Sequence, residues 1–121
     1  MRDDLASRVE AYHALPAEAL GDEARAVFDE LLDALERGEA RAAEPAADGW
    51  RVNGWVKKGI LLGFRLGRVV ETDPAGPLRF FDKDTFLPRR LALGDGVRMV
   101  PGGSSVRSGA FLAKGVVVMP R

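Results

Sequence analysis

Apolar residues recur at helical spacing in three stretches of the first half of the chain. The pattern predicts helices over residues 3–14, 23–37 and 54–65. Pro16 ends the first, and Asp22 and Asn53 stand where N-caps of the other two are expected. The apolar faces consist of Leu5, Val9, Tyr12 and His13, then Val27, Phe28, Leu31, Leu32 and Leu35, then Trp55, Val56, Ile60, Leu61 and Phe64. The chain is therefore predicted to begin as a helical body.

Two glycines, Gly59 and Gly63, interrupt the third predicted helix. Each costs about 1 kcal/mol relative to alanine in a helix interior. A helix that keeps both either uses them for close approach to a neighbour or is under weak selection for stability.

Short extended segments follow the helices. A connector, AAEPAADG, leads to a brief strand at residues 50–52, and further strands are predicted at 68–71, at 79–82 after the turn DPAGP, and at 97–100 after the turn GDG. The strands do not alternate with helices as they do in a doubly wound parallel fold. Residues 1–101 are therefore predicted to form an α+β domain.

A six-residue period begins near the end of the sequence. Val106, Leu112 and Val118 are spaced by six, with Gly109 and Gly115 between them. Three short strands joined at corners make one coil of a parallel β-helix, with these aliphatic residues pointing inward. The same residues are also compatible with two ordinary strands joined by a turn at residues 113–115. A coil buries its inner residues only by stacking on the next one, so we expect residues 106–121 to be a truncated first coil.

Composition narrows the classes of function. The 121 residues carry 18 Lys and Arg against 18 Asp and Glu, which gives no long-range field to attract nucleic acid or an anionic membrane. There is no cysteine, which excludes disulfides and thiolate zinc sites. The longest apolar run, GILLGF, is too short to span a bilayer. We therefore expect a cytoplasmic protein with no metal site. His13 is the single histidine and is expected to be an ordinary surface or helix-end residue.

Four blocks in order resemble the N-terminal part of the bacterial tetrahydrodipicolinate N-succinyltransferases. They are LLDALERGEARAAE, DGWRVNGWVKKGILLGFR, RFFDK and GVRMVPGGSSVRSGAFLAKGVVVMP. The resemblance implies an α+β front domain followed by a left-handed parallel β-helix of hexapeptide repeats, in a trimer with active sites between subunits. It also implies acyl transfer from succinyl-CoA to the amino group of a ring-opened dicarboxylate, in the biosynthesis of diaminopimelate and lysine.

One site of that family falls within the chain. The resemblance implies that Arg98, in the block G-[FV]-R-x-V-P, binds substrate, and a guanidinium offers a planar fork to a carboxylate. The alternative is a structural pair with Asp95. The family's catalytic residues and CoA contacts lie beyond the position matching Pro120, so no catalytic or cofactor-binding residue is assigned, and succinyl-CoA is expected only as the family's co-substrate.

Other charged residues in these blocks carry weaker signals. Lys57 and Lys58 are adjacent on a helix and stay unassigned, whereas Asp82 and Lys83 are expected to be structural. The stretch Gly102–Ser105 is one residue longer and more flexible than the family's proline-rich junction.

Three hypotheses for function follow. The first is the substrate-binding and assembly part of an N-succinyltransferase, inactive alone. The second is a non-catalytic module that forms a homotrimer or docks on a full-length acyltransferase, because an exposed strand edge seeks a partner. The third is a small α+β domain with an unrelated role.

Overall fold

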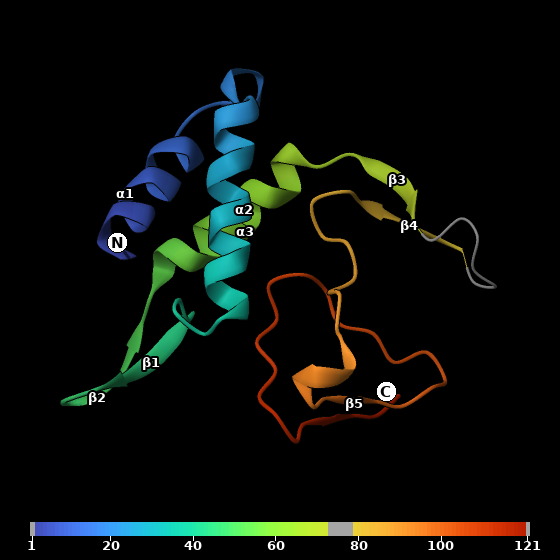
Figure 1. Cartoon of the computed structure of the whole chain (residues 1–121). Helices are drawn as coiled ribbons and strands as arrows, with labels where there is room; N and C mark the ends of the chain where they lie inside the picture. Colours follow the sequence, from blue (N-terminus) through green and yellow to red (C-terminus); the bar gives the residue numbers. More distant parts are fainter. Residues whose placement is uncertain (1, 73–78, 121) are drawn as a thin grey trace.

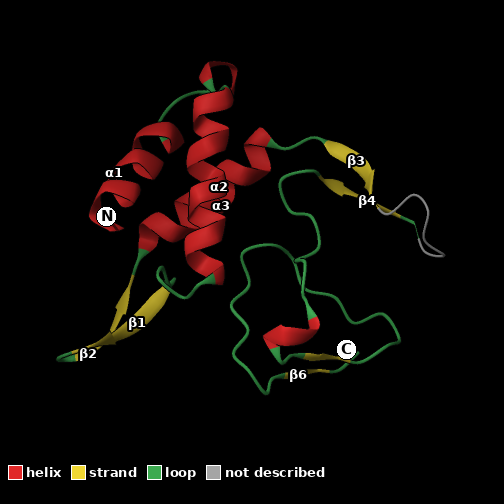
Figure 2. Cartoon of the chain, in the orientation of Figure 1, coloured by secondary structure: helices red, strands yellow, loops and turns green. Residues whose placement is uncertain are grey.

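The computed structural model describes residues 2–72 and 79–120. The helices are α1 (Arg2–His13), α2 (Asp22–Glu36) and α3 (Gly54–Leu66), with 3-10 turns η1 (Ala17–Ala19) and η2 (Leu93–Asp95). The strands are β1 (Ala43–Ala46), β2 (Gly49–Val52), β3 (Val69–Thr72), β4 (Phe80–Lys83), β5 (Arg98–Met99) and β6 (Val117–Val118). This mixture of helices and short strands agrees with the predicted α+β class (Figure 2).

The three helices pack together into one body, from which two hairpins and a C-terminal loop extend (Figure 1). Most of the core lies between the helices, and Phe86 from the loop after β4 adds to it. Full burial of one large aliphatic or aromatic side chain contributes about 1.5–3 kcal/mol. The largest fully buried side chains are Phe28, Leu31, Leu62, Val9 and Val56.

Two arginines join the helices at the surface of the body. Arg8 on α1 donates two hydrogen bonds of 2.9 Å to the carboxylate of Glu30 on α2. These bonds hold the pKa of Glu30 below its ordinary value. Arg65 on α3 donates 2.9 Å bonds to the carbonyls of His13 and Leu15, where α1 has run out of intrahelical partners. The helices are thus tied by side chains that satisfy charges and helix-end carbonyls.

The contact between α2 and α3 depends on glycine. A Cβ at Gly59 would overlap the Leu31 side chain, and a Cβ at Gly63 would overlap the ring of Phe28. The carbonyl of Gly63 also accepts a buried 2.8 Å hydrogen bond from the Thr85 hydroxyl. Close approach is therefore the reason that α3 keeps both glycines. We call this contact the glycine seam.

The buried face of α3 differs from the predicted apolar face. The buried residues of α3 are Val56, Gly59, Leu62 and Gly63. Leu61, predicted to be on the buried face, is 43% exposed, whereas Leu62 is fully buried. A prediction from hydrophobicity alone misplaces the buried face of α3, because the closest contacts with α2 are made at glycines, which have no side chain.

The helix caps also differ from expectation. Asp22 is the first residue of α2, and Gly21 occupies the cap position. Asn53 does precede α3, but its side chain donates a 2.8 Å hydrogen bond to the carbonyl of Arg41. Asn53 therefore fixes the chain on both sides of the first hairpin.

Two antiparallel hairpins extend from the helical body. In the first, β1 pairs with β2 from Ala43 opposite Val52 to Ala46 opposite Gly49, so the predicted connector contains a strand. In the second, β3 pairs with β4 from Val69 opposite Lys83 to Thr72 opposite Phe80. The turn predicted at DPAGP, residues 73–77, lies outside the described residues.

Residues 96–118 form a closed loop, which we call the C-terminal ring. Strand β5 pairs with β6 in parallel, Arg98 opposite Val117 and Met99 opposite Val118, so the ring closes on itself after nineteen residues. Val106, Leu112 and Val118 are each half-buried. Within the described residues, 106–111 and 112–118 do not pair with each other as strands, so the hairpin alternative is wrong.

We expect Gly63→Ala to lower the free energy of unfolding by about 2 kcal/mol, because overpacking against Phe28 outweighs the gain in helix propensity. Urea unfolding followed by circular dichroism measures the change. Gly54→Ala is the control, since a Cβ there meets nothing within 4 Å, and it should leave stability unchanged or slightly raised. Equal effects of the two substitutions would contradict the seam.

Candidate functional site

Arg98, the predicted substrate-binding residue, lies on β5 with its side chain exposed. Its backbone N–H donates a 2.9 Å hydrogen bond to the carbonyl of Val116, which fixes the strand within the ring. In the described part of the chain, the guanidinium has no hydrogen-bond or ion-pair partner. Asp95, the alternative partner, instead accepts a 2.8 Å bond from the Ala92 N–H across η2. The Arg98 side chain is thus open to an external anion.

The C-terminal ring is held against the helical body at the end of α2. Glu36 accepts a 2.7 Å hydrogen bond from the backbone N–H of Gly109, and its other oxygen lies 3.5 Å from Nε of Arg89. Nearby, the guanidinium of Arg41 lies over the ring of Phe111, 4.1 Å from its centroid. One carboxylate therefore joins two separate points of the C-terminal segment to the helices.

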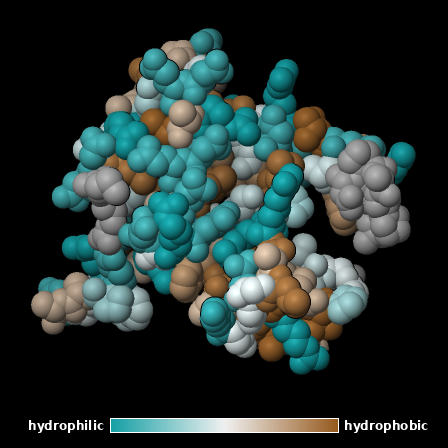
Figure 3. Space-filling view, in the orientation of Figure 1, coloured by the Kyte–Doolittle hydropathy of each residue, from teal (hydrophilic) through white to brown (hydrophobic). Residues whose placement is uncertain are grey.

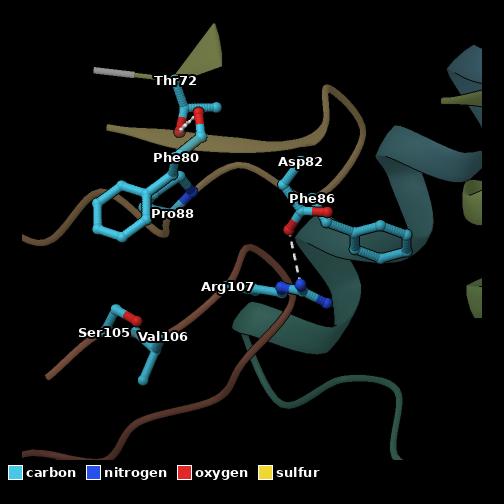
Figure 4. A pocket seen from close by; sticks show the side chains of 8 residues that line it. All are labelled: Thr72, Phe80, Asp82, Phe86, Pro88, Ser105, Val106 and Arg107. Atoms are coloured by element: carbon cyan, nitrogen blue, oxygen red, sulfur yellow. Dashed lines mark hydrogen bonds and ion pairs between the residues drawn. The ribbon is translucent and has the colours of Figure 1, made fainter. Parts of the chain in front are cut away.

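A cavity of about 210 Å³ lies between the second hairpin and the ring. Figure 4 shows Arg107 pointing toward Asp82, with Phe86 on one side and Ser105 and Val106 on the other. The Arg107 guanidinium donates a 2.6 Å hydrogen bond to Asp82. The residues that line the cavity are Thr72, Phe80, Asp82, Phe86, Pro88, Ser105, Val106 and Arg107. Arg98 does not line it, so the predicted site residue and this cavity are separate.

Three other charged residues of the sequence blocks, Asp82, Lys83 and Lys58, make contacts within the fold. Asp82 bonds Arg107 and also accepts from the Lys83 N–H at 2.8 Å. Lys83 donates to the carbonyl of Gly67 at 3.2 Å, and Lys58 lies 3.7 Å from Glu10 on α1. These contacts match the structural role expected for Asp82 and Lys83.

Sequence reasoning missed Glu36 and Arg107 as positioning residues. Arg107 stands in the block V-R-x-G-A-F, so its presence was visible but its partner, 25 residues earlier, was not. Glu36 is one of several acidic residues on α2, and nothing in the sequence around it indicates a contact with the C-terminal segment. Over residues 2–72 and 79–120, no group of three or more His, Asp or Glu residues is arranged to hold a metal ion, and no helix is long and apolar enough to cross a membrane.

Comparison with known proteins gives a consistent result. Residues 3–66 match the family described as "Tetrahydrodipicolinate N-succinyltransferase N-terminal". The chain is 40% identical to the 2,3,4,5-tetrahydropyridine-2,6-dicarboxylate N-succinyltransferase of Granulibacter bethesdensis over 125 residues, covering 98% of this chain and 44% of the relative. Relatives of the same name from Gluconobacter oxydans and Afipia carboxidovorans are 45% and 43% identical over 80% and 81% of this chain. The chain spans 37% of the length of each of these two.

We expect Glu36→Ala to loosen the ring without unfolding the helices. Losing a hydrogen bond to a charged group costs about 1.5–3 kcal/mol, so the amides of Ser108 and Gly109 should exchange with solvent about tenfold faster or more. Hydrogen exchange followed by NMR measures this. Glu30→Ala, which removes an acid that does not contact the ring, should leave these amides unchanged; equal acceleration by both variants would contradict the role of Glu36.

Proposed function

The chain belongs to the tetrahydrodipicolinate N-succinyltransferase N-terminal family, and from that membership we propose that it forms the substrate-binding and assembly part of such an enzyme. The reaction is transfer of a succinyl group from succinyl-CoA to the amine of a ring-opened dicarboxylate, a step of diaminopimelate and lysine biosynthesis in the cytoplasm. The proposal places the catalytic and CoA-binding residues of the family beyond the position that matches Pro120, so residues 1–121 are proposed to be inactive by themselves.

The C-terminal ring supports a β-helical start. Three six-residue strands make one coil of a parallel β-helix, and the ring closes in parallel after nineteen residues. A regular coil of three six-residue strands has eighteen residues. The nineteenth residue of the ring is accounted for by the junction at Gly102–Ser105, which is one residue longer than in the family. Half-burial of Val106, Leu112 and Val118 fits a coil without a stacked neighbour.

Arg98 is the residue that we propose to bind the dicarboxylate, and its free guanidinium is the observation on which the proposal rests. Among described residues it is not neutralised by any acid. The strand that carries it is fixed to residues 116–118 by two backbone hydrogen bonds, from the Arg98 N–H to Val116 and from the Val100 N–H to Val118. The planar guanidinium is preorganised for two hydrogen bonds to a carboxylate, so less side-chain entropy is lost per hydrogen bond than with lysine. The proposed assembly is a homotrimer.

A second candidate function is assembly or docking without catalysis, and the first hairpin favours it. Trp50 and Val52 on β2 are 74% and 77% exposed. Their cross-strand partners are Pro45 and Ala43, so one face of the hairpin is entirely apolar. An isolated two-stranded hairpin is marginally stable in water. A protein surface that covers this face would stabilise it.

A fusion tests the first function. The chain is joined through Pro120 to the part of the Granulibacter bethesdensis relative that follows the aligned region, and release of free CoA thiol is followed with tetrahydrodipicolinate and succinyl-CoA. We expect the fusion to turn over and the isolated chain not to. Arg98→Gln should raise KM for the dicarboxylate about tenfold or more, because one charged hydrogen-bonding group is lost. Arg90→Gln, another exposed arginine, is the matched control.

The outcomes separate the two functions. A folded but inactive fusion, turnover by the isolated chain, or equal effects of Arg98→Gln and Arg90→Gln would each contradict the first. Light scattering of the isolated chain mixed with the full-length relative tests the second. A complex that Trp50→Ser abolishes would support docking, and a monomer without affinity for the relative would refute it.

A further inference from the structure

A second cavity lies between the helical body and the C-terminal ring, and it shares Phe86 and Arg107 with the first. It measures about 240 Å³. Its apolar wall comes from α2, α3 and the loop after β4, and its other wall is the ring segment 108–110 with Arg107. The apolar residues are Leu32, Leu35, Ile60, Phe64 and Phe86. We propose that this cavity binds a small carboxylic acid with an apolar body, the carboxylate bound by Arg107.

The size of the cavity sets the size of the ligand. An apolar protein cavity of about 150 Å³ accommodates benzene. A volume of about 240 Å³ therefore admits a phenyl ring or a short branched alkyl group together with a two-carbon linker. Five hydrophobic side chains with one convergent polar group form the composition that is usual in small-molecule sites.

The positive charge of Arg107 favours a ligand that carries a negative charge. Of the described residues that line the cavity, Arg107 alone is charged, and its side chain is 57% exposed. Among the described residues its only side-chain partner is Asp82, bonded through Nη2. The remaining N–H donors of the planar guanidinium suit a carboxylate. The acid is thus preferred over a neutral or cationic compound of the same shape.

Neighbouring acids do not compete for those donors. Asp82 is already bonded to Arg107 and to the Lys83 N–H. Glu36 contacts the ring at Gly109 but is engaged by that N–H and by Arg89. A bound acid would touch both the helices and the ring, so it should raise the stability of their contact by mass action.

The test uses the full chain and two probes of equal shape, 3-phenylpropionate and its neutral amide. We expect the acid to shift the NMR signals of Leu32, Ile60 and Phe86 with a Kd of roughly 1 mM, since the ligand contacts the site through only about ten non-hydrogen atoms. The amide should bind about tenfold more weakly, because it lacks the charge that Arg107 binds.

Variants locate the site. Arg107→Gln should reduce the affinity for the acid to that for the amide, and Ala110→Leu, which fills the cavity, should abolish binding of both. Arg90→Gln lies outside the cavity and should leave both unchanged. The proposal is overturned if the acid causes no shifts at about 20 mM, far above the expected Kd, or if the acid and the amide bind equally. It is also overturned if Arg90→Gln weakens binding as much as Arg107→Gln, or if the shifted signals cluster around Arg98 instead of the cavity.

Discussion

The close approach of α2 and α3 across the glycine seam is the contact on which the rest of the structure depends. Gly59 and Gly63 leave room for Leu31 and Phe28, two of the largest fully buried side chains. The same turn of α3 exposes the Gly63 carbonyl to the Thr85 hydroxyl, which brings Phe86 edge-on to Phe28 with ring centroids 5.3 Å apart. Removing the seam would therefore displace the loop that follows the second hairpin as well as the helix.

That loop connects the helical body to the C-terminal ring. Phe86 and Arg107 line both cavities described above. The ring has few buried residues of its own, and apolar atoms are visible across its surface, whereas the outward faces of α1 and α2 are mostly hydrophilic (Figure 3). Its position depends on a small number of contacts: Glu36 with Gly109, Asp82 with Arg107, and the antiparallel pairing of residues 87–89 with residues 106–108. A ring held in this way is suited to receive further packing, from another coil or another chain.

The sequence predicted helices, strands and family, but not the contacts between distant segments. The three helices were predictable because their apolar periodicity is strong, and the recognised blocks identified the family that residues 3–66 match. Strand β1 was missed because Ala43–Ala46 has little β-propensity and becomes a strand only through its pairing with β2. The face of α3 was misplaced because glycine carries no hydrophobic signal. Glu36 and Arg107 acquire their roles only when residues 73 and 25 positions apart meet.

The central claim is that the chain is a helical body carrying a parallel coil. Nuclear Overhauser effects in the 13C- and 15N-labelled protein test it most directly. We expect cross-strand contacts in a parallel register between Arg98 and Val117 and between Met99 and Val118. Contacts that instead pair residues 106–111 with 112–118 in an antiparallel register would show a hairpin, and the coil interpretation would then be wrong.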